Sequence, residues 1–377
     1  MNIEAVKILP IKVINDFVGI RSTSYESRIH LDMTMSWLMM AQDSTVDGGV
    51  SEGFHLLHGW LPSYPETTGY IIETFFDYYH AFNSKEEFKD RAIKMADWLV
   101  EIQFEDGAIP DSYFKKKMVF DTGMVVFGLS RAFIETQDDK YKSAAIKAAD
   151  WLLEQQDDNG SWVNYAAGNI PLAYYSRVAW SLLKVHEITQ DQRYSDACRK
   201  NIDWCLTQQD EAGWFDQASF NTRDHGQPFT HTIAYTLRGM LESGIYLKEN
   251  RYISAVKKSL ENFTKVMSVS GEIAGTYGKG WLPNEKYSCL TGNAQLAIIM
   301  SKYSRHSSEP EYADLAKKIN QYLKSFHAVD KGNRNIRGAI AGSFPIWGTY
   351  IHYCYPNWAA KFYAESLMSE LENVSGK

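Results

Sequence analysis

The chain has 377 residues, an apolar fraction of 45%, an aromatic fraction of 14% and a formal net charge of −7. The apolar fraction suffices for a large core, and the negative charge argues against nucleic acid as a partner. No apolar stretch reaches the ~18 residues that a membrane-spanning helix needs, so we expect no membrane span.

Residues 1–24 are predicted to form an N-terminal extension or a short helix that packs on the main domain. Their apolar stripe is interrupted by Glu4, Lys7, Lys12 and Asp16, so it lacks the apolar core of a signal peptide. The four cysteines of the chain show no paired metal-ligand spacing. These features predict a reduced, cytoplasmic protein.

Residues 25–377 are built from repeats of one pattern, a Trp anchor followed five residues later by Gln and then by Gly. The anchors Trp98, Trp151 and Trp204 are spaced 53 residues apart. Weaker copies extend the series, whose six anchors are Trp37, Trp98, Trp151, Trp204, Phe263 and Tyr322. A repeat cannot bury its own apolar face, so the six repeats predict a single domain.

Each repeat is predicted to contain two helices of different character. The first helices are expected at about 27–42, 86–104, 140–156, 195–209, 252–269 and 312–326. The second helices are expected from 66 onward and at about 121–135, 172–189, 231–247, 290–303 and 356–371. The second helices are apolar on all sides, as in 124–129, and are therefore buried. We predict an all-α (α/α)6 toroid of about 12 helices, with the second helices as its inner ring.

Four long loops join first helices to second helices, at 43–65, 210–230, 270–289 and 328–355. Loops of this length in compact domains are usually functional. Because all four make the same kind of connection, they should share one face with the N-termini of the inner helices. Those N-termini favour anionic groups. We expect the loops to border one cavity.

Few ionisable residues fall at the starts of the inner helices, and Glu66, Asp121 and His231 are among them. Two carboxylates that face a shared cavity can act as general acid and general base. The alternative for both is helix capping, since acidic residues suit a helix N-terminus. His231 is either a site residue or a satisfied polar residue under a loop. Adjacent inner helices, with axes ~8–10 Å apart, favour the wide carboxylate separation of inverting glycosidases.

The inner helices and the loops carry many aromatic residues with polar tips, beside Arg, His and carboxylates. Such a mixture suits a sugar, whose apolar faces stack on rings while its hydroxyls bond polar groups. The candidate substrate-binding residues are Asp47, Glu52, His55, Tyr64, Tyr174, Arg177, His225, Tyr277, Trp281, Asn293, Arg337, Trp347, His352, Tyr355 and Trp358. The alternative for any single aromatic is packing under a loop. His55 and His58 lack further ligand spacing, so we predict no metal site and no cofactor.

The pattern Trp151, Gln156, Gly160 and Trp162 resembles the repeat of terpene cyclase and protein prenyltransferase barrels. Asp121 with Thr122 and Gly123 is similar to the Asp-Thr-Ala of class II cyclases, but the Asp-x-Asp-Asp acid motif of those enzymes is absent. The resemblance implies a shared architecture.

Three segments, 47–53, 63–70 and 355–362, resemble a group of toroid proteins encoded among polysaccharide-biosynthesis genes, and the similarity extends over nearly the whole chain. It implies a glycan-related role. Toroids that act on carbohydrates include inverting and unsaturated-glucuronyl hydrolases, uronate lyases and sugar epimerases. The paired Asp of the unsaturated-glucuronyl hydrolases would need a second inner-helix Asp, where the register offers Tyr174.

The sequence therefore favours a carbohydrate-active enzyme with an oligosaccharide or polysaccharide substrate, above all a glycoside hydrolase that uses Glu66 and Asp121. A first alternative is a lyase or epimerase on a uronic acid, with Tyr287 or His231 as base and Arg177 or a loop arginine for the carboxylate. A second is a non-catalytic glycan-binding toroid, and a third is a terpenoid cyclase-like enzyme.

Overall fold

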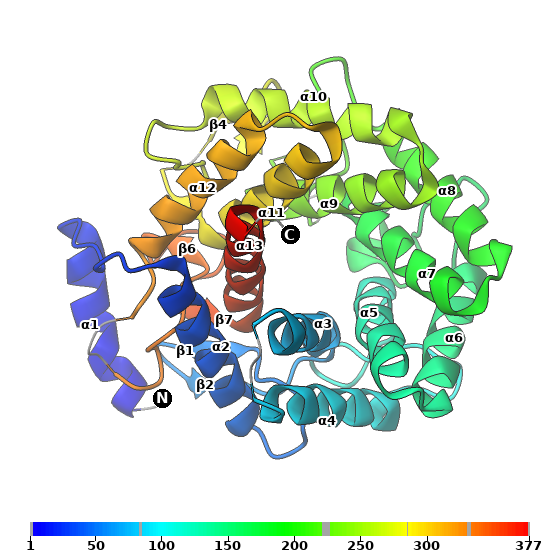
Figure 1. The fold of residues 1–377 in the computed structure, drawn as a ribbon, viewed down its shortest axis with the longest axis horizontal. Helices are drawn as coiled ribbons and strands as arrows, with labels where there is room; N and C mark the ends of the chain where they lie inside the picture. Colours follow the sequence, from blue (N-terminus) through cyan, green and yellow to red (C-terminus); the bar gives the residue numbers. More distant parts are fainter. Residues whose placement is uncertain (1–2, 83–84, 221–226, 285, 330–332, 376–377) are drawn as a thin grey trace.

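The computed structural model describes residues 3–82, 85–220, 227–284, 286–329 and 333–375. Twelve of its helices form two concentric rings (Figure 1). The outer ring consists of α2 (Ser27–Asp43), α4 (Glu87–Ile102), α6 (Asp139–Glu154), α8 (Gln192–Thr207), α10 (Asn250–Val266) and α12 (Glu311–Lys324). The inner ring consists of α3 (Pro65–Ala81), α5 (Val119–Thr136), α7 (Ser176–Thr189), α9 (Thr230–Leu247), α11 (Leu290–Ser307) and α13 (Asn357–Ser375). The predicted (α/α)6 toroid is confirmed.

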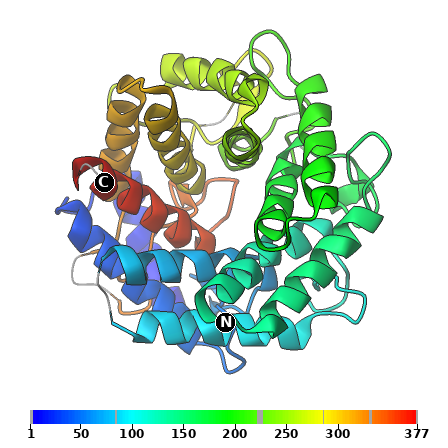
Figure 2. The same ribbon diagram turned by 45° about the vertical axis from the view of Figure 1, so that its right-hand side comes forward.

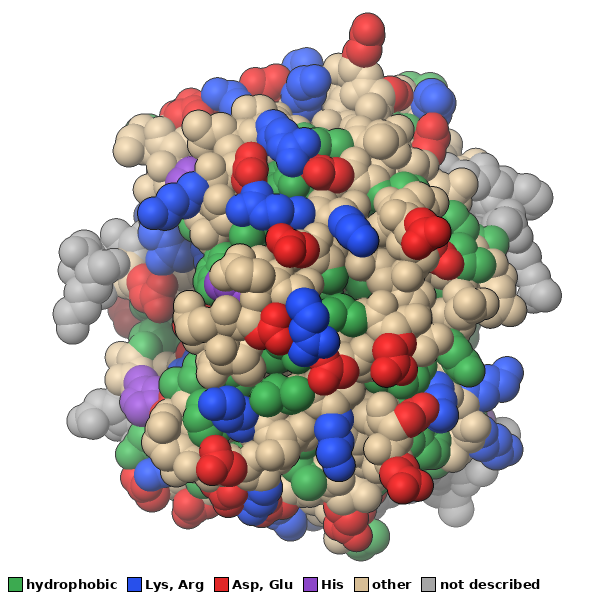
Figure 3. Space-filling model, turned by 90° about the vertical axis from the view of Figure 1, so that its right-hand side faces the viewer, with side chains coloured by type: hydrophobic (Ala, Val, Ile, Leu, Met, Phe, Trp, Pro, Cys, Tyr) green, Lys and Arg blue, Asp and Glu red, His purple; other side chains and the backbone are tan. Residues whose placement is uncertain are grey.

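The two rings differ in burial as their sequences predict. In the inner helix α5, every residue from Val119 to Ser130 is buried. In the outer helix α6, burial is confined to a stripe that includes Tyr141, Ala145 and Ala148, the spacing of one helix face. On the face that Figure 3 shows, acidic and basic side chains are interspersed. The outer helices are therefore the solvated layer around an apolar inner ring.

Helix contacts close the ring between its first and last members. Each inner helix contacts the next one along the chain, and α13 contacts α3. The inner helices α3, α5, α7, α9 and α11 each pack on the outer helix that follows them, across a short turn. The outer helix α2 packs instead on α13, as the views in Figures 1 and 2 agree. The tight hairpin is thus an inner helix followed by an outer one.

The repeated Gln and Gly residues join consecutive outer helices, at contacts that we call the outer seams. Gln156 Nε2 donates to Gly160 O at 3.1 Å and to Ala197 O of α8 at 2.9 Å. A Cβ on Gly160, whose φ is +90°, would lie 2.3 Å from Lys200 O, so glycine is required there. The repeated Trp–Gln–Gly motif is therefore a structural motif that holds consecutive outer helices together.

Short strands, which the sequence reading did not predict, tie the long loops together. The strands β1 (Gly53–His55), β2 (Gly59–Trp60) and β7 (Cys354–Pro356) form an antiparallel sheet in the order β2-β1-β7. This sheet joins loop 43–65 to loop 328–355. The remaining strands are the pair β3 (Tyr277–Gly278) and β4 (Leu282–Pro283) and the pair β5 (Ser288–Cys289) and β6 (Ser343–Phe344). The loops are thus held as one layer.

The helix α1 (Ile3–Phe17) lies outside the rings (Figure 1). The backbone N–H of Ile346 donates to Asp16 Oδ2 at 2.8 Å, which attaches this segment to loop 328–355. The division of the chain at residue 24 stays a prediction. Among the described residues, no helix has both the length and the apolar character needed to cross a membrane.

Candidate active site

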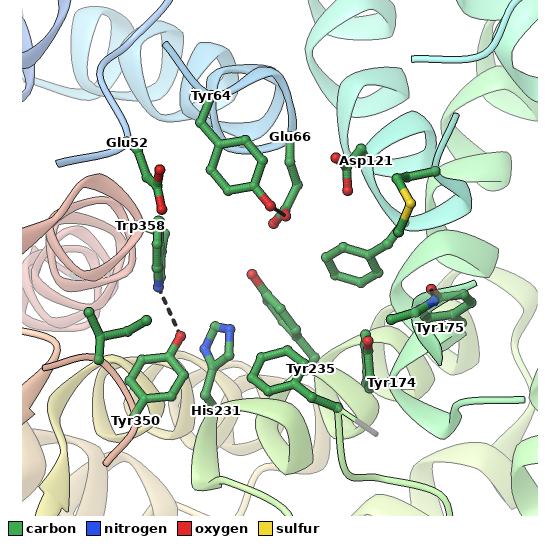
Figure 4. A pocket seen from close by; sticks show the side chains of 15 residues that line it. Glu52, Tyr64, Glu66, Asp121, Tyr174, Tyr175, His231, Tyr235, Tyr350 and Trp358 are labelled. Atoms are coloured by element: carbon green, nitrogen blue, oxygen red, sulfur yellow. Dashed lines mark hydrogen bonds between the residues drawn. The ribbon is translucent and has the colours of Figure 1, made fainter. Parts of the chain in front are cut away.

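A pocket of about 280 Å³ lies at the N-terminal ends of the inner helices, on the side of the long loops (Figure 4). Its lining consists of Glu52, Tyr64, Glu66, Met118, Phe120, Asp121, Ala167, Tyr174, Tyr175, Phe220, His231, Tyr235, Tyr350, Ile351 and Trp358. Seven of the predicted site residues are in this lining: Glu52, Tyr64, Glu66, Asp121, Tyr174, His231 and Trp358.

Helix starts position most of the ionisable groups of the pocket. Glu66 is the second residue of α3, where Pro65 opens the helix, and Asp121 is the third residue of α5. His231 is the second residue of α9. In Figure 4 the carboxylates of Glu66 and Asp121 extend into the same cavity from these neighbouring helices. The arrangement brings two carboxyl groups from neighbouring helices into one pocket.

Glu66 is buried and has a hydroxyl partner. It is 9% exposed, and the Tyr64 hydroxyl donates to its Oε2 at 2.5 Å. Burial raises the pKa of Glu66 from 4.5 to about 7. The Tyr64 hydrogen bond and the positive charge of Arg177 oppose this rise, because both stabilise the ionised form. Glu66 can therefore exchange a proton near neutral pH.

Asp121 lies in a less polar environment than Glu66. It is 5% exposed, and its pocket neighbours include Phe120 and Met118. Burial, followed by the negative charge of Glu66, raises the pKa of Asp121 well above its ordinary value. Burial also raises the pKa of Glu52, the third carboxyl group in the lining. The pocket thus contains three carboxyl groups, and no Lys or Arg is among the described residues that line it.

His231 faces the two carboxyl groups across the pocket (Figure 4). Its Nδ1 lies 2.7 Å from the amide Nε2 of Gln295, and its ring packs on Tyr235 with centroids 4.2 Å apart. Burial, together with the positive charge of Arg177, lowers the pKa of His231 well below its ordinary value. The imidazole is therefore neutral at physiological pH.

Arg177 lies one layer below the pocket and does not line it. It is 2% exposed, and its guanidinium stands 5.0 Å from the ring centroid of Tyr235 and 5.4 Å from that of Tyr70. Such cation–π contacts hold the charge among aromatic rings. The predicted contact of Arg177 with a substrate carboxylate is not available in this arrangement, because aromatic rings surround the guanidinium. Its charge acts on the pocket through Glu66 and His231.

Several predicted binding residues have structural contacts away from the pocket lining. Asp47 Oδ1 accepts hydrogen bonds from the Ser63 hydroxyl and the Gly49 N–H within its own loop. The Tyr277 hydroxyl accepts a hydrogen bond from the Ala274 N–H at 3.1 Å, and Trp281 Nε1 donates to Ala212 O at 2.9 Å. These side chains shape the loops that surround the pocket.

The other predicted residues outside the lining fall into three groups. Asn293 and Tyr355 are buried in α11 and β7, and Tyr287 is buried against Tyr350, behind the lining. Half-buried or exposed side chains on the loops are those of His55, Trp347, Arg337 and His352. His225 lies outside the described residues. No described residue of loop 270–289 lines the pocket, so the prediction that all four loops border one cavity is wrong for this loop. Its Tyr287 and Cys289 pack against Tyr350 of loop 328–355.

The predicted site residues do not include eight residues of the lining: Met118, Phe120, Ala167, Tyr175, Phe220, Tyr235, Tyr350 and Ile351. Helical spacing could have identified Tyr235, which lies one turn after His231 on α9. Tyr350 is an aromatic residue with a polar tip on loop 328–355, one of the loops expected to border the cavity, and its hydroxyl accepts a hydrogen bond from Trp358 Nε1 at 2.8 Å.

The described residues hold no group of three or more His, Cys, Asp or Glu arranged to bind a metal ion.

Comparison with protein families gave one match, in which residues 121–181 are similar to the pectic acid lyase model. This segment runs from the first turn of α5 to the first half of α7 and is too short to assign the whole chain. No curated protein matches the sequence.

Solved structures share the fold of the chain at low sequence identity. An unsaturated glucuronyl hydrolase specific for heparin is 14% identical, with 92% of this chain and 97% of that chain covered and a TM-score of 0.74. The cellobiose 2-epimerase from Bacillus thermoamylovorans B4167 is 12% identical, with coverages of 91% and 98% and a TM-score of 0.72. A D-mannose isomerase is 12% identical, with coverages of 92% and 97% and a TM-score of 0.72. The comparisons give no support to the terpene cyclase resemblance.

Proposed function

We propose that this protein is a carbohydrate-active enzyme, and specifically a glycoside hydrolase that acts on an uncharged sugar unit held in the pocket. One observation carries the proposal: Glu66 and Asp121 extend from adjacent inner helices into the same small cavity (Figure 4). Paired carboxyl groups on either side of a glycosidic bond are the usual catalytic apparatus of glycosidases. The shared toroid of the hydrolases and epimerases named above supports the same class.

The two carboxyl groups have environments that suit opposite roles. Asp121, beside apolar neighbours and the charge of Glu66, favours the protonated form and serves as general acid. Glu66 accepts a hydrogen bond from the Tyr64 hydroxyl, and the positive charge of Arg177 stabilises its ionised form. It therefore ionises more readily than Asp121 and serves as general base. Asp121 protonates the glycosidic oxygen as its bond to the anomeric carbon breaks. Glu66 takes a proton from the water that bonds to that carbon from the opposite face, and the configuration inverts.

The size and aromatic lining of the pocket fit a single sugar ring. Its volume is about 280 Å³, close to the lower end of the ~300–1,000 Å³ typical of small-molecule sites. Six aromatic residues with a hydroxyl or indole N–H line the pocket: Tyr64, Tyr174, Tyr175, Tyr235, Tyr350 and Trp358. Rings of this kind stack on the apolar faces of a sugar while their polar tips bond its hydroxyls.

The charges of the pocket favour a neutral sugar over a uronic acid. A uronate carboxylate would enter a buried site beside Glu52, Glu66 and Asp121, and none of the described residues that line the pocket is a Lys or Arg. Arg177, the cation predicted to hold a substrate carboxylate, is buried, and its guanidinium lies against the rings of Tyr70 and Tyr235. Elimination from a uronate needs that carboxylate to be neutralised, so the lyase alternative is disfavoured.

A second candidate is a sugar epimerase or isomerase, which the neutral imidazole of His231 favours. A neutral imidazole in a pocket can accept a proton from a sugar carbon. Proteins of this fold include a cellobiose 2-epimerase and a D-mannose isomerase. In such an enzyme, His231 and not the carboxylate pair would be essential for activity.

The test replaces Glu66 by Gln and Asp121 by Asn separately and measures hydrolysis of a panel of neutral aryl glycosides. Each variant should lose ~100-fold or more in rate, the scale of general acid–base catalysis, with an unchanged circular dichroism spectrum. Wild-type activity should rise with pH as Glu66, with its pKa near 7, loses its proton. NMR of the first product should show the inverted anomer.

Full activity in both amide variants would overturn the hydrolase assignment and leave the two carboxylates as helix caps. Isomerisation of free sugars that is abolished in His231→Asn, and retained in Glu66→Gln, would establish the second candidate in its place.

A further inference from the structure

A second and larger cavity opens beside the pocket. It has a volume of about 1,060 Å³, and we call it the groove. Met118 and Ala167 line both the pocket and the groove, so the two cavities meet at these residues. The groove lies between the loop that precedes α5 and the loop that follows α6. A chain of sugars whose end unit occupies the pocket can therefore continue into it.

The charge of the groove is opposite to that of the pocket. Lys115, Lys116 and Lys117 all line it, and its described lining contains no Asp or Glu. Lys117 is paired with Asp106. The side chains of Lys115 and Lys116 are exposed, and neither forms an ion pair within the described ranges. Two lysines are thus available to a ligand on a protein whose net charge is −7.

The backbone around these lysines is well fixed. Asp111 Oδ1 accepts hydrogen bonds from the N–H groups of Lys115, at 2.9 Å, and Lys116, at 3.3 Å. Across the groove, Tyr165 is 45% exposed, and its ring packs on Trp151 with centroids 5.4 Å apart. A half-exposed ring that is supported from behind is a platform for a sugar face. Asn164 and Asn169 add amide groups to the same lining.

We infer that the groove binds the part of the glycan that continues beyond the pocket, and that this part carries anionic groups, either carboxylates or phosphate esters. The inference rests on the proposed function and names the substrate class for the same site. The sugar in the pocket is neutral because Glu52, Glu66 and Asp121 line its site. The sugar units in the groove are anionic, because Lys115 and Lys116 attract negative groups there. The net negative charge of the protein disfavours a polyanion elsewhere on the surface.

Calorimetric binding tests this inference on the Asp121→Asn chain, which keeps the ligand intact. The probes are a neutral oligosaccharide, a uronate-bearing one and a phosphate-bearing one, all of the same length. The Lys115→Gln/Lys116→Gln variant should bind the matching anionic probe about 3- to 10-fold more weakly, the scale of two exposed charge contacts, and the neutral probe unchanged. The stronger of the two anionic probes identifies the group.

The matched control is Lys147→Gln/Lys200→Gln, which removes the same charge from exposed positions on α6 and α8. It should leave binding of every probe unchanged, while Lys115→Arg/Lys116→Arg should keep the affinity for the anionic probe. Raising the salt from ~0.1 M to ~1 M should weaken anionic binding to the parent chain and abolish the difference from the Gln pair.

Equal binding of neutral and anionic probes, or an unchanged affinity in the Gln pair, would overturn the inference and leave the hydrolase assignment intact. Charge-dependent binding by a wild-type chain that hydrolyses none of the probes would support the groove and overturn the hydrolase assignment. The two failures are therefore distinguishable.

Discussion

The outer seams and the pocket are built from the same six repeats, but the seams keep the same residues in successive repeats and the pocket does not. At the seams, the same bonds recur: Gln103 Nε2 donates to Gly107 O at 2.9 Å and to Ala144 O at 3.0 Å, as Gln156 does one repeat later. At the pocket, the equivalent helix-start positions hold Glu66, Phe120, His231 and Cys289. The residues that hold the outer helices together are therefore the same in successive repeats, whereas the residues at the pocket differ from repeat to repeat.

This difference predicts that seam substitutions lower stability and leave the activity of the folded protein intact. Pocket substitutions should lower the activity without lowering the stability of the fold. Three measurements of stability test this separation between seam and pocket.

The largest effect on stability is expected for Gly160→Ala. The added Cβ would meet Lys200 O at 2.3 Å while the backbone keeps a φ of +90°. We expect a loss of roughly 3 kcal/mol or more in the free energy of unfolding, from clash and conformational strain together. Urea denaturation gives the value. The control is Gly280→Ala, where φ is +79° and nothing lies within 4 Å, so strain alone should cost about 1 kcal/mol.

Equal losses in the two glycine variants would show that the seam contact carries no special weight. A fall in the activity of the folded Gly160→Ala protein would break the separation between seam and pocket.

A smaller effect is expected from the pH dependence of stability. Because the folded pKa of Glu66 is raised from 4.5 to about 7, its stabilising contribution is fully present below pH 4.5 and is lost as pH rises through 7. Glu66→Gln removes this loss, so it should gain roughly 2–3 kcal/mol on the wild type between pH 4.5 and 8. Denaturation curves at several pH values measure the gain. A constant difference between the two proteins would mean that Glu66 ionises normally.

The smallest effect is expected for the seam glutamines. Gln103→Ala, Gln156→Ala and Gln209→Ala each leave backbone carbonyl groups without their amide donor, and each should cost about 1–2 kcal/mol. Because the geometry is repeated, the three losses should be alike. Gln208→Ala, whose amide reaches its neighbour Thr207, is the control and should change little. Widely different costs at the three seams would contradict the equivalence of the repeats.

The fold could be predicted from the sequence because the repeat fixes it. The Trp and Gln residues recur at a constant step, and the inner helices are apolar on all sides, so their number, order and ring position follow. The predicted helix boundaries agree with the structure within a few residues at most ends. The short strands of the loops were missed, because two- and three-residue strands leave no periodic signal.

The site could be predicted only in part. Residues at helix starts, such as Glu66, Asp121 and His231, reach the pocket because the repeat register places them there. Loop residues such as Tyr350 and Phe220 depend on loop paths that no register fixes. Arg177 has the right position along α7, but the surrounding rings enclose its side chain. The catalytic roles themselves stay predictions.

The packing of α2 on α13 has a consequence for how the ring assembles. Ser27 of α2 donates to Glu370 of α13 at 2.6 Å across 343 positions in the chain. During synthesis, α2 therefore leaves the ribosome long before the helix that covers it, while the hairpins between them can form as they emerge. Closing so long a loop adds little entropic cost, which grows only with the logarithm of length, but it is slow. A nascent chain would carry the apolar side of α2 uncovered, open to chaperones, until its last helix arrived.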